Sequence, residues 1–306
     1  LEAVTRGEIR KLAIAIPPGH MKSLCVSVFW PAWVWASNPG WRAIFASYAG
    51  ELAIRDSVRC RAVIESDAYQ QAYCAPGGWA LASDQNVKSY FKNSAQGERL
   101  ALGVGGKATG WRGDAVVCDD ALNATDAPSE AARATVQEWW SRAMSSRLND
   151  MRTGAHVIIG QRLHEDDLTG YAMGRGGYEY LCLPSEYDSK RRSVTMGGKW
   201  QDWRTEDGEL LFPEMFPREV LERAKVDLGS DGYASQHDQL PQPASGGMFK
   251  LEWWRRYTKL PHNLDEWIAS LDCTFKETKG TDFVVCQVWA KVWANRYLVK
   301  SYRARR

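Results

Sequence analysis

The chain has 306 residues, of which 44% are hydrophobic and 25% charged, as in a soluble globular protein of one large or two ordinary domains. Its net charge of +2 is too small to identify a nucleic-acid-binding protein. The seven cysteines form no CxxC pair or zinc-type spacing, and no apolar run approaches the roughly 20 residues that cross a bilayer, which argues against a disulfide framework, a structural zinc and a membrane protein.

Short apolar runs alternate with longer helical segments over the first two thirds of the chain. Runs rich in Val, Ile and Ala predict buried parallel strands at 12–16, 43–48, 115–118 and 156–160. Between them, helices are predicted over 22–35, 51–66 and 129–148, the last with Ser129 as its N-cap. This alternation predicts an α/β sheet with helices on both faces.

The composition changes from about residue 187 to residue 247, where Gly, Pro and Asp become frequent. This composition predicts a small lid or linker subdomain. A new apolar pattern follows at 267–271, 283–289 and 297–299. These runs predict the first strands of a second domain.

The segment between the first strand and the first helix predicts a phosphate-binding loop, with the residues Pro17, Pro18, Gly19, His20, Met21, Lys22 and Ser23. Backbone N–H groups at a helix N-terminus attract phosphates, a lysine reaches the β- and γ-oxygens, and a serine hydroxyl binds Mg²⁺. The pattern GxxxxGK(S/T) is met only at Lys22 and Ser23, because Ile16 and Met21 occupy its glycine positions. The alternative is an ordinary strand-to-helix turn with an exposed lysine.

Two acids end the third predicted strand. Asp119 would hold Mg²⁺ and Asp120 would act as the catalytic base, as in a Walker B segment. The alternative is a pair of solvated loop residues.

The fourth strand ends in Gln161 and Arg162. Ligands of a doubly wound sheet lie at the carboxyl ends of its strands, so Gln161 is placed to sense the γ-phosphate, unless it only caps the strand. The order phosphate loop, acid pair, polar sensor makes nucleotide hydrolysis the favoured function.

Several strings together resemble the large terminases of tailed bacteriophages across nearly the whole chain. They are LAIAIPPGHMKS at 12–23, TGWRGDAVVCDDAL at 109–122, IGQRLHEDDLTG at 159–170, YASQHDQLPQP at 233–243, GMFKLEWW at 247–254 and LDCTFKETKGTDF at 271–283. The order and spacing of these pieces are more specific than any single phosphate loop.

The resemblance implies an ATPase of the ASCE P-loop type at 1–186, a lid or linker subdomain at 187–245 and the start of an RNase H-like nuclease domain at 246–306. It assigns Lys22 and Ser23 to ATP and Mg²⁺, Asp119 to the Walker B acid, and Gln161 with Arg162 to the motif that couples hydrolysis to movement. Asp272 matches the first acid of a nuclease site that uses Mg²⁺ or Mn²⁺. A ring motor also needs an arginine finger, and Arg147 is favoured among three arginines that follow the acid pair.

Some positions depart from the family pattern. Gly19 stands where many relatives have Arg, Met21 replaces a Gly, and Asp120 replaces the usual Glu. We expect the adenine-binding segment and the remaining nuclease acids to lie outside this chain, which makes nuclease activity of the chain doubtful.

The family further implies partners and a location. These are double-stranded viral DNA, a small terminase subunit, the portal protein and other copies of the chain in a ring, in the host cytoplasm and transiently docked on the procapsid, with no membrane. Two other functions stay open. One is a helicase-like nucleic-acid ATPase, and the other is a packaging scaffold that no longer hydrolyses ATP.

Overall fold

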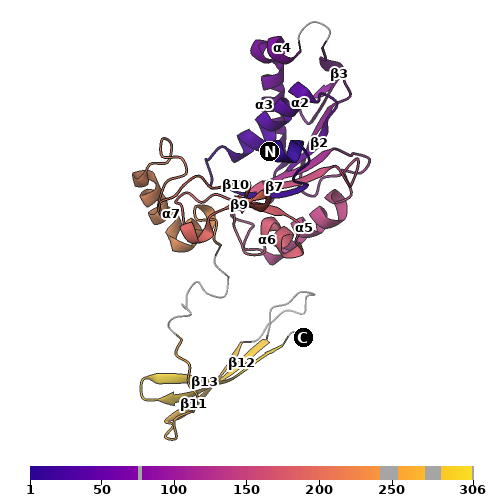
Figure 1. Ribbon diagram of the computed structural model, residues 1–306. Helices are drawn as coiled ribbons and strands as arrows, with labels where there is room; N and C mark the ends of the chain where they lie inside the picture. The colour runs from indigo at the N-terminus through magenta and orange to yellow at the C-terminus, as the bar shows by residue number, and fades with distance from the viewer. Residues whose placement is uncertain (75–77, 242–253, 273–283, 305–306) are drawn as a thin grey trace. The chain divides into compact units, whose positions relative to one another are not determined.

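The computed structural model describes residues 1–74, 78–241, 254–272 and 284–304 (Figure 1). They belong to two compact units, Leu1–Gly247 and Met248–Arg306. Within the described residues, no helix is both long and apolar enough to cross a membrane.

An eight-stranded sheet with the order β3-β4-β5-β2-β6-β7-β1-β8 forms the centre of the first unit. Its strands are β1 (Lys11–Ala15), β2 (Arg42–Ser47), β3 (Leu81–Val87), β4 (Tyr90–Asn93), β5 (Glu98–Gly103), β6 (Ala115–Asp119), β7 (Ala155–Gly160) and β8 (Glu179–Cys182). The pairs from β5 through β8 are parallel, whereas β3-β4 and β4-β5 are antiparallel. All four strands that the apolar runs predict are present, so the predicted α/β class is confirmed.

Side chains of the central strands alternate between two hydrophobic cores. Phe45, Val117 and Val157 point to one face of the sheet, whereas Ile44, Val116 and Ile158 point to the other. Both faces are therefore buried, which explains why these strands are continuous apolar runs and not alternating ones.

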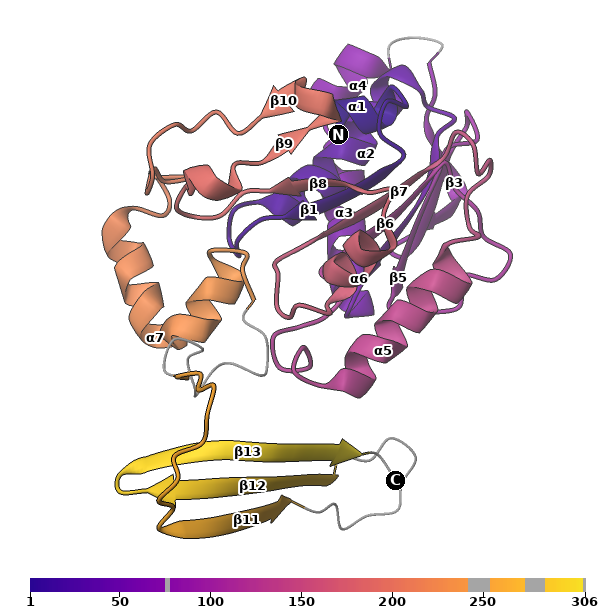
Figure 2. The ribbon, with the colours of Figure 1, turned by 60° about the horizontal axis from the view of Figure 1, so that its bottom comes forward.

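Helices cover both faces of the sheet (Figure 2). The core that contains Phe45 lies beneath α1 (Glu2–Thr5), a π-helical segment η1 (Leu24–Phe29), α2 (Trp30–Ser37), α3 (Gly50–Glu65) and α4 (Asp67–Tyr73). The core that contains Ile44 lies beneath α5 (Glu130–Trp139), a second π-helical segment η2 (Trp140–Met144) and α6 (Leu168–Arg175). Ser129 caps α5 as predicted, with its hydroxyl accepting the N–H of Ala132 at 3.3 Å.

The segment after β8 belongs to the first unit. It contains two short helical turns, η3 (Ser189–Arg191) and η4 (Met196–Gly198), the strand pair β9 (Val194–Thr195) and β10 (Trp200–Gln201), and the long helix α7 (Arg218–Gln236), which is kinked at Gly229. A fully buried ion pair between Arg204 and Asp202, at 2.8 Å, organises it. The Arg204 guanidinium also donates to the carbonyl of Pro184, which ties the segment back to the end of β8.

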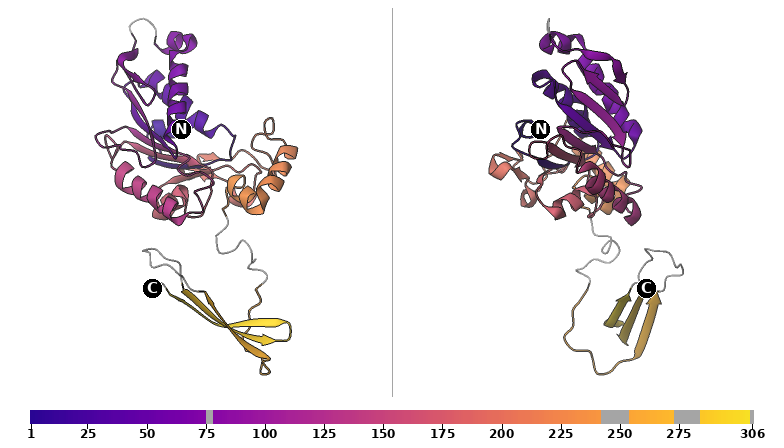
Figure 3. Two further views of the ribbon diagram at one scale, coloured as in Figure 1. Left: turned by 180° about the vertical axis from the view of Figure 1, so that it is seen from behind. Right: turned by 90° about the vertical axis from the view of Figure 1, so that its right-hand side faces the viewer.

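The second unit is a twisted antiparallel sheet in the part that the structure describes (Figure 3). Its strands are β11 (Glu266–Asp272), β12 (Val284–Val292) and β13 (Asn295–Ala304). β12 lies in the middle, and its pairing with β13 contains a bulge at Val288 and Trp289. The apolar runs at 267–271, 283–289 and 297–299 predict strands that overlap these three. Phe283, the first residue of the second run, lies outside the described residues.

Candidate functional site

The loop between β1 and η1, where the phosphate-binding loop is predicted, contains two residues with a left-handed backbone. Gly19 and Met21 have φ angles of +76° and +58°, in the left-handed region that favours glycine. Met21 therefore occupies a position whose backbone suits glycine, as the general pattern requires. The helix starts at Lys22, which directs the first free N–H groups of the helix into the loop.

Gly19 has a second reason to be glycine. A Cβ atom at this position would lie 2.5 Å from Cζ of Phe216, from the segment just before α7. The Phe216 ring stacks on the ring of the next loop residue, His20, with 4.2 Å between centroids. A side chain at position 19 would therefore require the Phe216 ring to move. Burial lowers the pKa of His20 and favours its neutral form.

The phosphate loop and the acid pair meet through two direct contacts. Nζ of Lys22 lies 3.3 Å from Oδ2 of Asp120, and the hydroxyl of Ser23 donates to Oδ1 of Asp119 at 3.0 Å. The sheet explains this meeting: the ends of β1 and β6 are two strand spacings apart, roughly 10 Å, and a lysine side chain spans much of that gap. Residues nearly 100 positions apart in the sequence are thus in direct contact.

A third group fixes Asp119 from the helix. The hydroxyl of Ser27 on η1 donates to Oδ2 of Asp119 at 2.6 Å, so both carboxylate oxygens accept a hydrogen bond. The pKa of Asp119 is raised, first by burial and then by the negative charge of Asp120, against the effect of Ser27, Lys22 and Ser23. The two carboxylates therefore repel each other in a buried place where an added cation would be stabilising.

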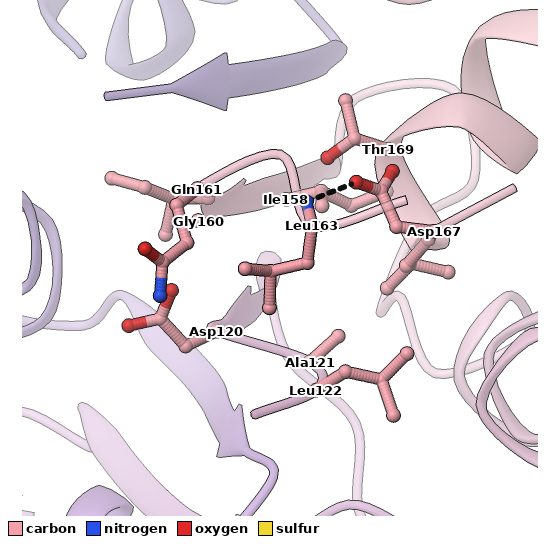
Figure 4. A pocket seen from close by; sticks show the side chains of 11 residues that line it. Asp120, Ala121, Leu122, Ile158, Gly160, Gln161, Leu163, Asp167 and Thr169 are labelled. Atoms are coloured by element: carbon pink, nitrogen blue, oxygen red, sulfur yellow. Dashed lines mark hydrogen bonds between the residues drawn. The ribbon is translucent and has the colours of Figure 1, made fainter. Parts of the chain in front are cut away.

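Gln161 lies beside Asp120 because β7 is inserted between β1 and β6. Figure 4 shows the amide of Gln161 and the carboxylate of Asp120 pointing toward each other, at the edge of a small cavity of about 20 Å³. The Asp120 carboxylate rests against Gly160, where a Cβ would lie 3.2 Å from Oδ1. The backbone of Asp120 is itself left-handed, with φ +47°.

Two acceptor atoms at this edge lack a hydrogen bond among the described residues. They are Oδ1 of Asp120 and Oε1 of Gln161, both buried. Buried acceptors are nearly always satisfied, so orphans at the mouth of a phosphate loop suit a bound water or ion. The nearby donor set, the Ser23 hydroxyl and the Asp119 carboxylate, consists of the oxygen ligands that Mg²⁺ prefers. The residues present therefore fit an Mg²⁺·nucleotide complex.

Arg162, the other residue of the predicted coupling motif, has partners from several parts of the chain. Its Nε donates to Asp167 at 2.9 Å, its Nη1 to the Tyr180 hydroxyl at 3.4 Å, and its backbone N–H to Oε1 of Gln239 at 2.9 Å. Gln239 follows α7, so this contact joins the end of β7 directly to the segment that precedes the second unit.

Arg147 lies away from this site within one chain. Its carbonyl accepts the N–H of Gly113 before the amino end of β6, and its Nε donates to the carbonyl of Ala143. The acid pair lies at the opposite end of β6, roughly 20 Å away at 3.3 Å per residue. A finger role for Arg147 therefore requires a neighbouring copy of the chain, and it stays a prediction.

Asp272 is the last residue of β11 and is exposed. Over the described parts of the chain, no group of three or more His, Cys, Asp or Glu side chains is arranged to hold a metal ion. Residues 273–283, which include Asp282, lie outside the described residues. The metal-binding role of Asp272 therefore also stays a prediction.

The sequence did not reveal Ser27 or Phe216 as parts of the site. Ser27 is one serine within an apolar helix, and its position one turn after Ser23 is the signal that could have identified it. Phe216 follows the site by nearly 200 residues, and no local pattern connects it with His20.

Comparison with known proteins finds similar solved structures, whereas no protein-family model and no curated protein matches the sequence. The large terminase of the HK97 bacteriophage is 10% identical, with 94% of this chain and 57% of that chain covered and a TM-score of 0.45. The large terminase of a thermophilic bacteriophage in complex with ADP is 10% identical, with 99% and 67% covered and a TM-score of 0.45. The ATPase domain of the Thermus phage P74-26 large terminase is 12% identical, with 79% and 92% covered and a TM-score of 0.46. The chain thus spans 57% and 67% of the length of the first two. All three of these similar structures are of bacteriophage large terminases.

Proposed function

We propose that this chain is the ATP-hydrolysing motor of a bacteriophage large terminase, which moves double-stranded DNA into a procapsid. The observation that carries the proposal is the meeting of Lys22, the acid pair and Gln161 at the carboxyl ends of three adjacent strands. A lysine for the phosphates, a carboxylate for the metal, a second carboxylate and a polar sensor are the parts that phosphoryl transfer needs.

Each residue has a separate task in this scheme. Lys22 and the N–H groups of the loop bind the β- and γ-phosphates, with Pro18, Gly19, His20 and Met21 shaping the loop. Ser23 and Asp119 would hold Mg²⁺, which, when bound, neutralises charge on the phosphate oxygens. Ser27 keeps Asp119 oriented through its 2.6 Å hydrogen bond.

Asp120 and Gln161 are placed to handle the attacking water. Asp120 accepts a proton as general base, and Gln161 orients the same water through its amide. In the structure Asp120 is paired with Lys22, so nucleotide binding must draw Lys22 away to the phosphates and free the carboxylate.

The remaining roles follow from the same proposal. Arg147 of one copy would serve as the finger for the next copy in a ring on the portal protein. A small terminase subunit would deliver the viral DNA, and the work would take place in the host cytoplasm on a docked procapsid. In the full-length protein the segment 246–306 would begin the nuclease domain, with Asp272 as its first Mg²⁺ or Mn²⁺ ligand, and 187–245 would be the lid.

Hydrolysis of ATP by the purified chain, with and without linear double-stranded DNA, tests the proposal. We expect DNA-stimulated hydrolysis without separation of the strands of a forked duplex, and no hydrolysis by Lys22→Ala. Strand separation would indicate a helicase-like ATPase. Absence of nucleotide binding by the folded wild-type chain would indicate a scaffold, and either result overturns the proposal.

A further inference from the structure

The helical segment after the phosphate loop contains a proline, Pro31, at the start of α2. Proline has no N–H to donate, so in a regular helix the carbonyl four residues earlier, that of Ser27, loses its partner. Ser27 and Pro31 are both buried, and water cannot replace the missing donor. An unpaired buried carbonyl is costly, so the fold must supply a donor from elsewhere.

The backbone widens where the donor is missing. Leu24–Phe29 is π-helical, and the N–H of Trp30 donates to the carbonyl of Cys25, five residues back. Such π segments occur frequently at functional sites. The carbonyl of Ser27 accepts a hydrogen bond of 2.8 Å from Nη2 of Arg99 on β5.

Arg99 is an unusual residue for this place because it is only 1% exposed. Its guanidinium carbon lies 4.3 Å from the centre of the Phe45 ring, and its Nε and Nη1 atoms have no hydrogen-bond partner in the described chain. Burying a guanidinium with unpaired donors is expensive, and an apolar side chain of similar volume often stabilises a core better. Packing alone therefore does not explain Arg99.

Ser27 connects this buried charge with the acid of the site. Its carbonyl accepts from Arg99, and its hydroxyl donates to Oδ2 of Asp119 at 2.6 Å. Since both groups belong to one residue, the bond to Arg99 fixes the peptide from which the hydroxyl reaches Asp119. Burial lowers the pKa of Arg99, against the opposing effects of Cys60, of Asp56 and, most weakly, of Asp119.

We propose that Arg99 is a positioning residue of the metal site, which holds the π-helical turn open and thereby keeps the Ser27 hydroxyl on Asp119. The proposal rests on the ATPase function proposed above. It assigns no contact between Arg99 and nucleotide. Loss of Arg99 should weaken Mg²⁺ binding by releasing Asp119 from its fixed orientation, and should leave the metal-free contact of Lys22 with the phosphates intact.

The test is Arg99→Met, which retains most of the volume and removes the charge. Mg²⁺ is titrated into the full chain with a fluorescent ATP analogue, and the same analogue is bound in EDTA. Groups that orient a metal ligand are typically worth about 10- to 100-fold in metal affinity, and we expect about tenfold here with unchanged binding in EDTA. Arg133→Met is the matched control, because Arg133 is also buried and donates to one carbonyl, that of Ala127, on the other face of the sheet.

A double-mutant cycle shows whether Arg99 acts through Ser27. Ser27→Ala should weaken Mg²⁺ binding to a similar degree, and Arg99→Met added to it should cost little more, since coupled residues are not additive. Ser57→Ala is its control, because the Ser57 hydroxyl is buried without a partner among the described residues and should leave Mg²⁺ binding unchanged.

The outcomes separate the two proposals. If the wild-type chain binds no nucleotide, the proposed function fails. If the wild type binds Mg²⁺·nucleotide and folded Arg99→Met binds it equally well, or if the two losses simply add, the positioning role fails alone. If Arg99→Met does not fold, Arg99→Lys replaces it in the test, because lysine keeps the charge but donates from a shorter side chain. The same Mg²⁺ titration of Arg99→Lys, alone and combined with Ser27→Ala, then tests the positioning role.

Discussion

Replacing Asp120 by asparagine should slow hydrolysis and at the same time tighten nucleotide binding. Asparagine keeps the size of the side chain and tolerates the left-handed backbone, φ +47°, better than most residues. It removes the general base, whose contribution is typically about 10²- to 10⁴-fold in rate. We therefore expect turnover at saturating Mg²⁺·ATP to fall by that factor.

The gain in binding follows from the ion pair. Oδ2 of Asp120 lies 3.3 Å from Nζ of Lys22, with the two side chains 24% and 8% exposed, so ATP must compete with the carboxylate for the ammonium group. A partly exposed pair of this kind is worth up to about 1 kcal/mol. Without the carboxylate charge, the dissociation constant should fall by up to about fivefold.

Calorimetric titration of ATP and a steady-state phosphate-release assay measure the two effects on the same samples. Lys22→Ala serves as the comparison, because it should weaken binding as well as abolish turnover. Turnover of Asp120→Asn within about tenfold of wild type would exclude the base role. Weaker Mg²⁺-dependent binding would instead make Asp120 a metal ligand.

Three further changes probe other parts of the site. Asp119→Asn should weaken Mg²⁺-dependent nucleotide binding together with turnover, and a titration that finds binding unaffected would reverse the roles of the two acids. Gly19→Ala should lower the free energy of unfolding in urea by about 1–2 kcal/mol from backbone strain alone, and by more from the Cβ atom 2.5 Å from Phe216. In a Phe216→Ala background only the strain should remain, and an equal loss in both backgrounds would show that the ring does not constrain the loop. Asp272→Asn in the full-length protein should abolish DNA cleavage and spare ATP hydrolysis, and joint loss of both in a folded protein would contradict separate sites.

The local pattern of the sequence predicts the strands that carry the site. Continuous runs such as Ala43–Ser47 and Ala155–Gly160 are mostly apolar because both faces of the sheet are covered. Successive residues of these strands are therefore all buried, and the sequence shows this directly. β3 was not predicted, because an edge strand with Asp84, Gln85 and Asn86 carries no apolar run. β8, the strand at the other edge of the sheet, was not predicted either, because its residues are only half-buried and form no apolar run.

The sequence alone also predicted which residues follow the carboxyl ends of the central strands, and hence that Lys22, Asp119, Asp120 and Gln161 lie at one edge. Only the tertiary structure decided how they pair. The insertion of β7 between β1 and β6 places Gln161 against Asp120, and the strand spacing brings Lys22 to the same carboxylate.

The outer supports of the site belong to the tertiary structure as well. Phe216 reaches His20, Gln239 reaches Arg162, and Arg99 reaches Ser27 across 72 positions of the sequence. Hydrophobic periodicity indicates which residues of a helix or strand are buried. It does not indicate which distant residue donates a hydrogen bond to them or packs an aromatic ring against them. Pro31 predicts that the carbonyl of Ser27 needs a partner, and only the fold shows that the partner is the buried guanidinium of Arg99.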